Sequence, residues 1–245
     1  MNSFLRFFIK RKKLFLFVGG IMNRRIFYTE VAYVLGLIGL AWGTAFMEAA
    51  NFGVSMVVAP AYLIYLKLSQ VLEFFSFGMA EYTLQAFLLI ILMIVLRKFK
   101  VSYLFSFVTA VIYSFFLDGS MRMVALFPHE LLALRFALYF LGIIFCAAGV
   151  SLLFHTYIAP EVYELFVKEV SSKFKINIHK FKTFYDCMSC FAGIVLSFTF
   201  FGFWHFEGVK IGTIVCALLN GWIISQCTHF FERHWEFKDG LSMRR

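Results

Sequence analysis

Six long apolar stretches dominate this sequence of 245 residues. They cover residues 31–49, 81–96, 101–117, 131–154, 184–203 and 209–231. A helix needs about 20 mainly apolar residues to cross the hydrocarbon core of a bilayer, and each stretch is close to that length. With 62% hydrophobic and 15% charged residues, the chain has too little polar surface to cover a soluble globule. The sequence therefore predicts an all-α integral membrane protein with six transmembrane helices.

The lysine and arginine residues predict how these spans are oriented. If the N-terminus lies in the cytoplasm, the inner segments are residues 1–30, 97–100, 155–183 and 232–245, and they hold 19 of the 23 basic residues. Cytoplasmic loops of membrane proteins carry this kind of excess. We therefore expect a multi-pass protein of the bacterial cytoplasmic membrane with both termini in the cytoplasm. The net charge of +9 arises in these segments, so it does not indicate a nucleic-acid partner.

The two terminal segments are expected to lie outside the spans. A basic run over residues 10–13 precedes an apolar run of nine residues, 14–22, which ends in polar residues rather than at a small-residue cleavage site. This pattern favours a retained basic segment, residues 1–30, at the inner membrane surface over a cleaved signal peptide. Residues 232–245 are expected to form a short cytoplasmic tail.

Two prolines in matching contexts divide the membrane region into halves. Pro60 and Pro160 each follow an alanine, come after an apolar span, and precede a short amphipathic stretch and a pair of spans. The chain therefore divides into two repeats, residues 31–130 and 131–231. Because each repeat holds three spans, the second must enter the membrane from the opposite side, so the repeats are inverted. Inverted repeats with broken helices are a common build of secondary transporters.

The segments around the two prolines are expected to differ. Residues 54–66, which precede Lys67, carry no charge and are too few to span the membrane. We therefore expect segment 52–69 to be re-entrant or packed between spans. Segment 159–173 carries five charged residues, so for this one we favour a helix on the membrane surface over a re-entrant element. They include Glu161, Glu164, Lys168 and Glu169.

Three carboxylates near the outer ends of the first three spans form one candidate site. A charged group placed within a bilayer costs about 2.5 to 3.5 kcal/mol on insertion scales, so Glu48, Glu81 and Asp118 each need a reason to be there. They could converge on an ion or solute, with Arg122 and Arg135 as partners. The alternative is that each side chain only reaches the membrane surface.

A second candidate group lies on the inner side, around the second proline. It comprises His155, Tyr157, Glu161 and Asp186. A histidine beside a carboxylate can relay protons near neutral pH. The alternative is that His155 is only an interfacial residue.

Two asparagines are the polar candidates for contact with a solute. Asn51 follows the first span, and Asn220 lies in the middle of the last span, where it must find a partner on a neighbouring helix or on a solute. No phosphate-binding loop, zinc motif or mid-span catalytic set occurs, so we expect neither an enzyme nor a metal or cofactor site. Cys187 and Cys190 form a lone CxxC, which is more typical here of apolar thiols than of a metal site.

Several short motifs over residues 31–231 resemble the YitT/YczE-like family of bacterial membrane proteins. They are Ala50-Asn51-Phe52-Gly53, Phe77-Gly78, Asp118, Ala148-Gly149-Val150, Ala159-Pro160-Glu161 and Gly208-Val209-Lys210-Ile211-Gly212-Thr213. The chain departs from the family in having no acid directly after Gly53 and no Gly-Thr in its first half. The resemblance implies a membrane protein presumed to be a transporter or permease, without an agreed substrate.

These patterns together predict a secondary carrier that moves a small organic solute across the lipid bilayer by alternating access between the two halves. The alternative is a non-transporting membrane subunit, or a substrate-binding component of a larger transport complex. Association into a homodimer stays open.

Overall fold

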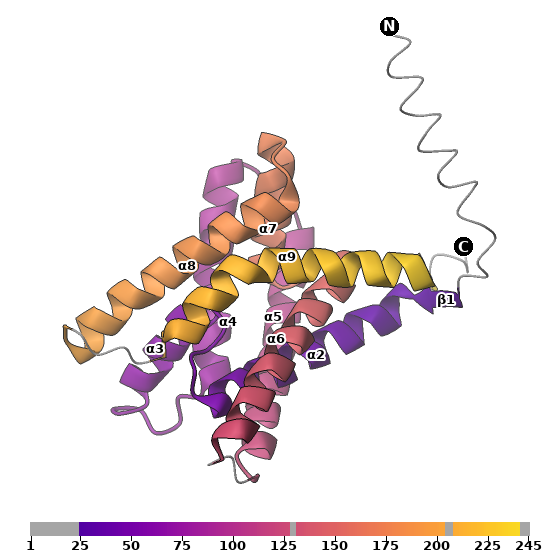
Figure 1. The fold of residues 1–245 in the computed structure, drawn as a ribbon. Helices are drawn as coiled ribbons and strands as arrows, with labels where there is room; N and C mark the ends of the chain where they lie inside the picture. The colour runs from indigo at the N-terminus through magenta and orange to yellow at the C-terminus, as the bar shows by residue number, and fades with distance from the viewer. Residues whose placement is uncertain (1–24, 128–130, 204–207, 241–245) are drawn as a thin grey trace, which may run out of the picture.

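The computed structural model describes residues 25–127, 131–203 and 208–240 (Figure 1). The predicted interfacial segment therefore lies almost wholly outside the described residues, as does the end of the tail. The described residues form eight helices, of which six are long and apolar enough to cross a membrane. These six are α2 (Thr29–Ala50), α4 (Phe77–Leu96), α5 (Ser102–Val124), α6 (Leu132–Phe154), α8 (Ile178–Phe201) and α9 (Ile211–His234). The predicted all-α membrane fold with six spans is confirmed.

Helix α4 begins earlier than its apolar stretch because its first turn is capped. The hydroxyl of Ser76 accepts a hydrogen bond from the backbone N–H of Met79 at 3.1 Å. Asp118, near the end of α5, accepts from the Ser76 hydroxyl at 2.7 Å and from the Gly78 N–H at 2.8 Å. These bonds satisfy N–H groups that a helix start leaves without partners. Asp118 therefore fixes the α4–α5 hairpin at the end remote from its tight turn.

Two short strands join the described ends of the chain. Strand β1 (Arg25–Tyr28) pairs in parallel with β2 (Trp235–Lys238), with Arg25 opposite Trp235. The apolar pattern gave no sign of this pair. It places the start of α2 and the end of α9 at the same end of the bundle, which we call the terminal end (Figure 1). The other end is called the opposite end.

Helices α2 and α6 cross very closely because glycines face one another. A Cβ atom on Gly43 would lie 2.7 Å from the backbone nitrogen of Cys146, and one on Gly149 would lie 2.7 Å from the carbonyl oxygen of Gly36. Small residues let helix backbones approach in a membrane, where packing rather than the hydrophobic effect holds helices together. This crossing lies in the main core of the bundle.

The two short helices, α3 (Ala59–Leu68) and α7 (Val162–Phe174), both begin inside the bundle. A Cβ on Gly193 of α8 would lie 3.5 Å from that of Ala59, whereas the N–H of Val162 donates to the side chain of Gln85 in the central part of α4. From there α3 runs to the opposite end, where Lys67 donates to the Phe200 carbonyl. Helix α7 instead runs to the end of α4, where the ammonium group of Lys173 donates to the Val95 carbonyl.

This arrangement confirms one prediction and corrects another. Segment 52–69 is packed between spans, as expected. Segment 159–173 is not a surface helix, because the first turn of α7 is buried against α4 and α8. Only one side of α7 is polar and exposed, and the carboxylates near its start find partners inside the bundle. The surface position was predicted on the assumption that all charged residues of segment 159–173 face solvent.

The helices pack in matching pairs. Helix α2 packs on α5, and α6 packs on α9; α4 packs on α5, and α8 packs on α9. Helix α3 lies between α4 and α8, and so does α7. The two short helices therefore lie against the same pair of spans and run toward different ends of the bundle.

Candidate functional site

A group of buried carboxylates lies where the start of α7 meets α4 and α8. Helix α4 contributes Glu81 and, one turn later, Gln85, while α8 contributes Lys182 and Asp186. We call the carboxylates of Glu81, Glu161, Glu164 and Asp186 the carboxylate cluster; their residues are 0%, 2%, 4% and 0% exposed. Four acids this deeply buried are unusual, because charged side chains are almost never buried without partners.

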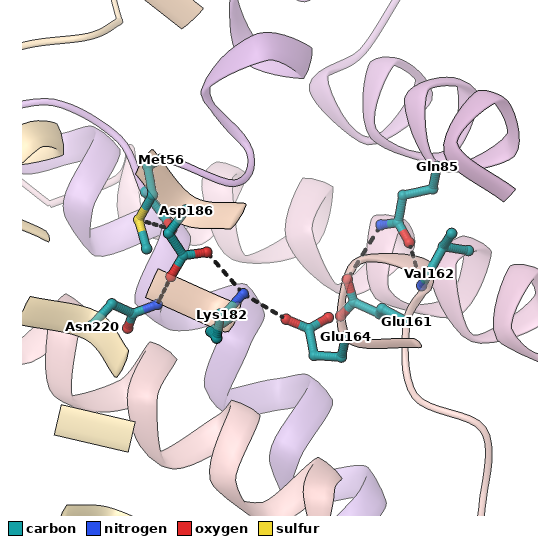
Figure 2. Close-up of polar contacts among 9 residues, drawn as sticks. Met56, Gln85, Glu161, Val162, Glu164, Lys182, Asp186 and Asn220 are labelled. Carbon is teal, nitrogen blue, oxygen red and sulfur yellow. Dashed lines mark hydrogen bonds and ion pairs between the residues drawn. The ribbon is translucent and has the colours of Figure 1, made fainter. Parts of the chain in front are cut away.

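One side of the cluster is a chain of ionic contacts from α7 to α9 (Figure 2). The ammonium group of Lys182 lies 3.4 Å from Oε1 of Glu164 and 3.1 Å from Oδ1 of Asp186. The other oxygen of Asp186 accepts a hydrogen bond from Nδ2 of Asn220 at 3.1 Å. Lys182 thus connects two carboxylates, and Asn220 connects α9 to them.

The other side of the cluster joins α7 to α4. Nε2 of Gln85 donates to Glu161 at 3.2 Å, and Oε1 of Gln85 accepts from the N–H of Val162 at 3.0 Å (Figure 2). The hydroxyl of Tyr163 donates to Oε2 of Glu81 at 3.0 Å. Gln85 therefore holds both the first N–H of α7 and the acid that precedes it, and this fixes the helix start against the central part of α4.

The cluster has more negative groups than the surrounding donors satisfy. Oε1 of Glu81, Oε1 of Glu161 and Oε2 of Glu164 are buried and have no hydrogen-bond partner within the described chain. Lys182 is the one cation among the described residues that forms an ion pair with the cluster. An unpaired buried charge costs several kcal/mol, so further protons or a cation must balance these acids.

Glu161 shows how strongly this site favours a bound proton. It lies in the connection between α6 and α7, outside the six long helices. Burial raises its pKa well above the ordinary value, and the nearby charges of Glu164 and Glu81 raise it further. Its hydrogen bond from Gln85 opposes this shift only in part.

The structure divides the predicted outer group. Glu81 turns toward Tyr163 and belongs to the carboxylate cluster, whereas Asp118 caps α4 and Glu48 accepts a hydrogen bond from Tyr62 at 3.3 Å. Arg135 does not meet these acids as expected but donates to the carbonyl oxygen of Ala50 at 2.8 Å. The candidate site in which these three acids converge at the outer mouth is therefore not formed.

The predicted inner group is also divided. Glu161 and Asp186 lie in the carboxylate cluster, but His155 lies at the terminal end, where its Nδ1 contacts the Ser151 carbonyl at 2.7 Å and its Nε2 lies 3.5 Å from Glu232. Tyr157 donates to Glu30, also at that end. His155 is therefore not positioned to relay protons to the cluster.

The two predicted asparagines have different surroundings. Asn220 is buried and bound to Asp186, as a mid-span asparagine requires. Asn51 ends α2 with a left-handed backbone, φ 58°, and accepts hydrogen bonds from Lys210. Asn51 therefore closes a loop at the opposite end, away from the cluster.

Four residues of the site were not among the candidates from the sequence. Glu164 was assigned to a surface helix and Lys182 to an inner loop, and Gln85 and Tyr163 were not considered. Lys182 and Asp186 are four residues apart, a spacing that brings side chains together on one helix face. Gln85 is a polar residue in an otherwise apolar part of a span. Both signals were present in the sequence.

A separate groove of about 1000 Å³ opens between α6 and α9. Its lining is mostly aliphatic and aromatic, including Phe140, Ile144 and Ile211, whose side chains are exposed on the outside of the bundle. Such a surface suits the hydrocarbon of a bilayer rather than a polar solute. The charged residues that are buried in the described chain, by contrast, all belong to the carboxylate cluster or pair with it.

Comparison with known proteins places the chain in a family. Residues 27–229 match a family of unknown function, DUF6198. The chain belongs to this family. No curated protein and no solved structure matches it. All residues of the carboxylate cluster lie within the part of this DUF6198 chain that the family covers.

Proposed function

We propose that this DUF6198 protein is a secondary carrier that moves a small organic solute by alternating access. The observation that carries the proposal is the carboxylate cluster, which is buried at the point where the start of a short helix meets two spans. Transporter sites are often built from broken helices at the middle of the membrane, and intramembrane acids commonly take part in ion or proton transfer. The resemblance to YitT/YczE-like proteins points in the same direction.

The packing of the helices supports two inverted repeats, residues 31–130 and 131–231. Helices α2, α3, α4 and α5 correspond in order and contacts to α6, α7, α8 and α9. Helices α3 and α7 run from inside the bundle toward different ends of it, as inversion requires. The close α2–α6 crossing joins the two halves and would serve as the pivot, because its glycines leave little side-chain bulk to resist a change of angle.

The orientation follows from the basic residues. Lys182 is buried and does not count as a loop residue, but 18 of the 23 lysines and arginines still fall in the segments assigned to the terminal end. We therefore place the terminal end in the bacterial cytoplasm. The carboxylate cluster then opens to one side of the membrane when α7 moves away from α4 and α8.

Uptake into proteoliposomes tests the proposal. The full chain is reconstituted, a proton or sodium gradient is imposed, and accumulation of labelled solutes is measured against Glu161→Gln protein in the same lipid. Gradient-dependent accumulation by wild-type protein only is the expected result. If no solute moves under either gradient, and a stoichiometric ATPase copurifies from mild detergent, the protein is instead a subunit of a larger complex.

A further inference from the structure

We infer that the carried solute is a cation with one ammonium or guanidinium group, bound by Glu81, Glu161 and Glu164 in exchange for a proton. This inference rests on the proposed carrier function and assigns the chemical class of the solute. It follows from the charges, the unused acceptors and the existing lysine contact in the carboxylate cluster.

The charge balance excludes an anionic solute. Four buried carboxylates face one ammonium group, that of Lys182. The donors around them, on Gln85, Tyr163 and Asn220, already bond to carboxylate oxygens. An anion brought to this place would meet like charge in surroundings of low dielectric, which strongly disfavours its binding.

The unused atoms are all acceptors. Oε1 of Glu81, Oε1 of Glu161 and Oε2 of Glu164 lie buried without a donor in the described part of the chain. A group with several N–H bonds matches such a set, because carboxylates form their strongest hydrogen bonds with cationic donors. An ammonium group offers three N–H donors and a guanidinium five. A quaternary ammonium ion offers none and would leave the same atoms unpaired.

Lys182 is a tethered example of the same ligand chemistry. Its ammonium group lies between Glu164 and Asp186, 5.7 Å from the ring centre of Tyr185. Figure 2 shows this group reaching the cluster from one side, with Glu161 and Gln85 on the other. The carboxylate cluster therefore already binds one alkylammonium group, that of Lys182.

The exchange balances in charge. In the closed state a proton neutralises a carboxyl of the Glu81, Glu161 and Glu164 set. Arrival of one monovalent cation releases one proton to solvent and leaves the carboxylate paired with the cation. The net charge of the site is then the same before and after, so transport by this route is electroneutral cation–proton exchange and responds to a pH gradient but not to membrane potential.

Binding is tested first, without transport. The full chain in detergent is titrated with n-butylammonium chloride, which reproduces the end of the Lys182 side chain, and thermal unfolding is followed. We expect a saturable rise in Tm, and no rise with tetramethylammonium or butyrate at the same ionic strength. Glu161→Gln and Glu164→Gln should weaken binding by about tenfold or more, since each removes a charged hydrogen-bond acceptor. Glu73→Gln, the same change at an exposed position, should leave binding unaltered.

Proton release provides a second readout that needs no variant. Calorimetric titration of wild-type protein in two buffers with different ionisation enthalpies should give about one proton released per butylammonium bound. Absence of butylammonium and methylguanidinium binding, in protein that accumulates neutral or anionic solutes in vesicles, overturns the inference and leaves the carrier function standing. Binding with proton release in protein that moves no solute supports the cation site and overturns the carrier function.

Discussion

The α2–α6 crossing predicts a large effect from one methyl group. In Gly43→Ala the new Cβ would lie 2.6 Å from Sγ and 2.7 Å from the backbone nitrogen of Cys146, and 2.8 Å from the Gly142 carbonyl oxygen. Ordinary contacts of this kind begin at 3.4 Å, so the main-chain contacts fall short by about 0.6–0.7 Å. A side chain could rotate away, but two of these three atoms belong to backbone. The helices themselves must move apart.

The expected loss of stability follows from two opposing terms. Overpacking a close-packed site costs about 1–3 kcal/mol, and the upper end applies where backbone is contacted. Replacing glycine by alanine within a helix stabilises the helix by up to about 1 kcal/mol, because alanine has the higher helix propensity. We therefore expect the free energy of unfolding to fall by about 2 kcal/mol, a substantial part of the stability of an ordinary domain.

Gly119→Ala is the matched control. Gly119 also lies within a long helix, α5, but a Cβ there would meet nothing within 4 Å. The same substitution should be neutral or slightly stabilising. The two variants are compared by thermal unfolding in detergent. A thiol-reactive dye reports the exposure of the buried Cys146 and Cys216. Equal unfolding temperatures for the two variants would contradict the close approach of α2 and α6 at Gly43.

Three further predictions concern stability. The pKa of Glu161 is raised from 4.5, so the folded state binds its proton more tightly than the unfolded state does. The free energy of unfolding should therefore fall as the pH rises from about 4.5 through the raised pKa, and Glu161→Gln should flatten this pH profile. Lys182→Met should cost about 3–5 kcal/mol in chemical denaturation at neutral pH by leaving its carboxylates unpaired, whereas Lys182→Arg keeps the charge and should cost clearly less. Thr213→Val removes the 2.8 Å hydrogen bond to the Val54 carbonyl and should lower the unfolding free energy by about 1–3 kcal/mol, but Thr213→Ser should retain most of it.

The spans were predictable because their signal is local. Length and apolarity suffice to locate a helix that crosses a membrane, and the six stretches recover all six long helices of the described chain. Their starts were less accurate, because α4 begins at Phe77 and α8 at Ile178, ahead of the apolar residues. The capping bonds of Asp118 and the buried position of Lys182 explain these extensions, and both depend on other helices.

The carboxylate cluster was only partly predictable, because it too depends on contacts between distant helices. Glu81, Glu161, Asp186 and Asn220 attracted attention as polar residues in or near spans, but the sequence assigned Glu81 to one side of the membrane and Glu161 to the other. They come together because α7 turns back into the bundle, and local pattern does not reveal such a turn. Charge along α7 instead favoured a surface position. Gln85, on the distant helix α4, bonds to Glu161 and to the N–H of Val162, so the start of α7 is buried instead.

The two short helices resemble each other in position but not in chemistry. The first turn of α3 is Ala59 and Pro60, packed against Gly193, whereas α7 is preceded by Glu161 and carries Glu164 in its first turn. A helix start favours negative charge, so the dipole of α7 favours the ionised carboxylates near its start, whereas the first turn of α3 carries no acidic residue. If the halves exchange access as proposed, Glu161 and Glu164 travel with α7, Glu81 stays on α4, and α3 supplies packing. Opening on the α7 side then exposes protons for exchange, and opening on the α3 side must reach the same acids through α4 and α8.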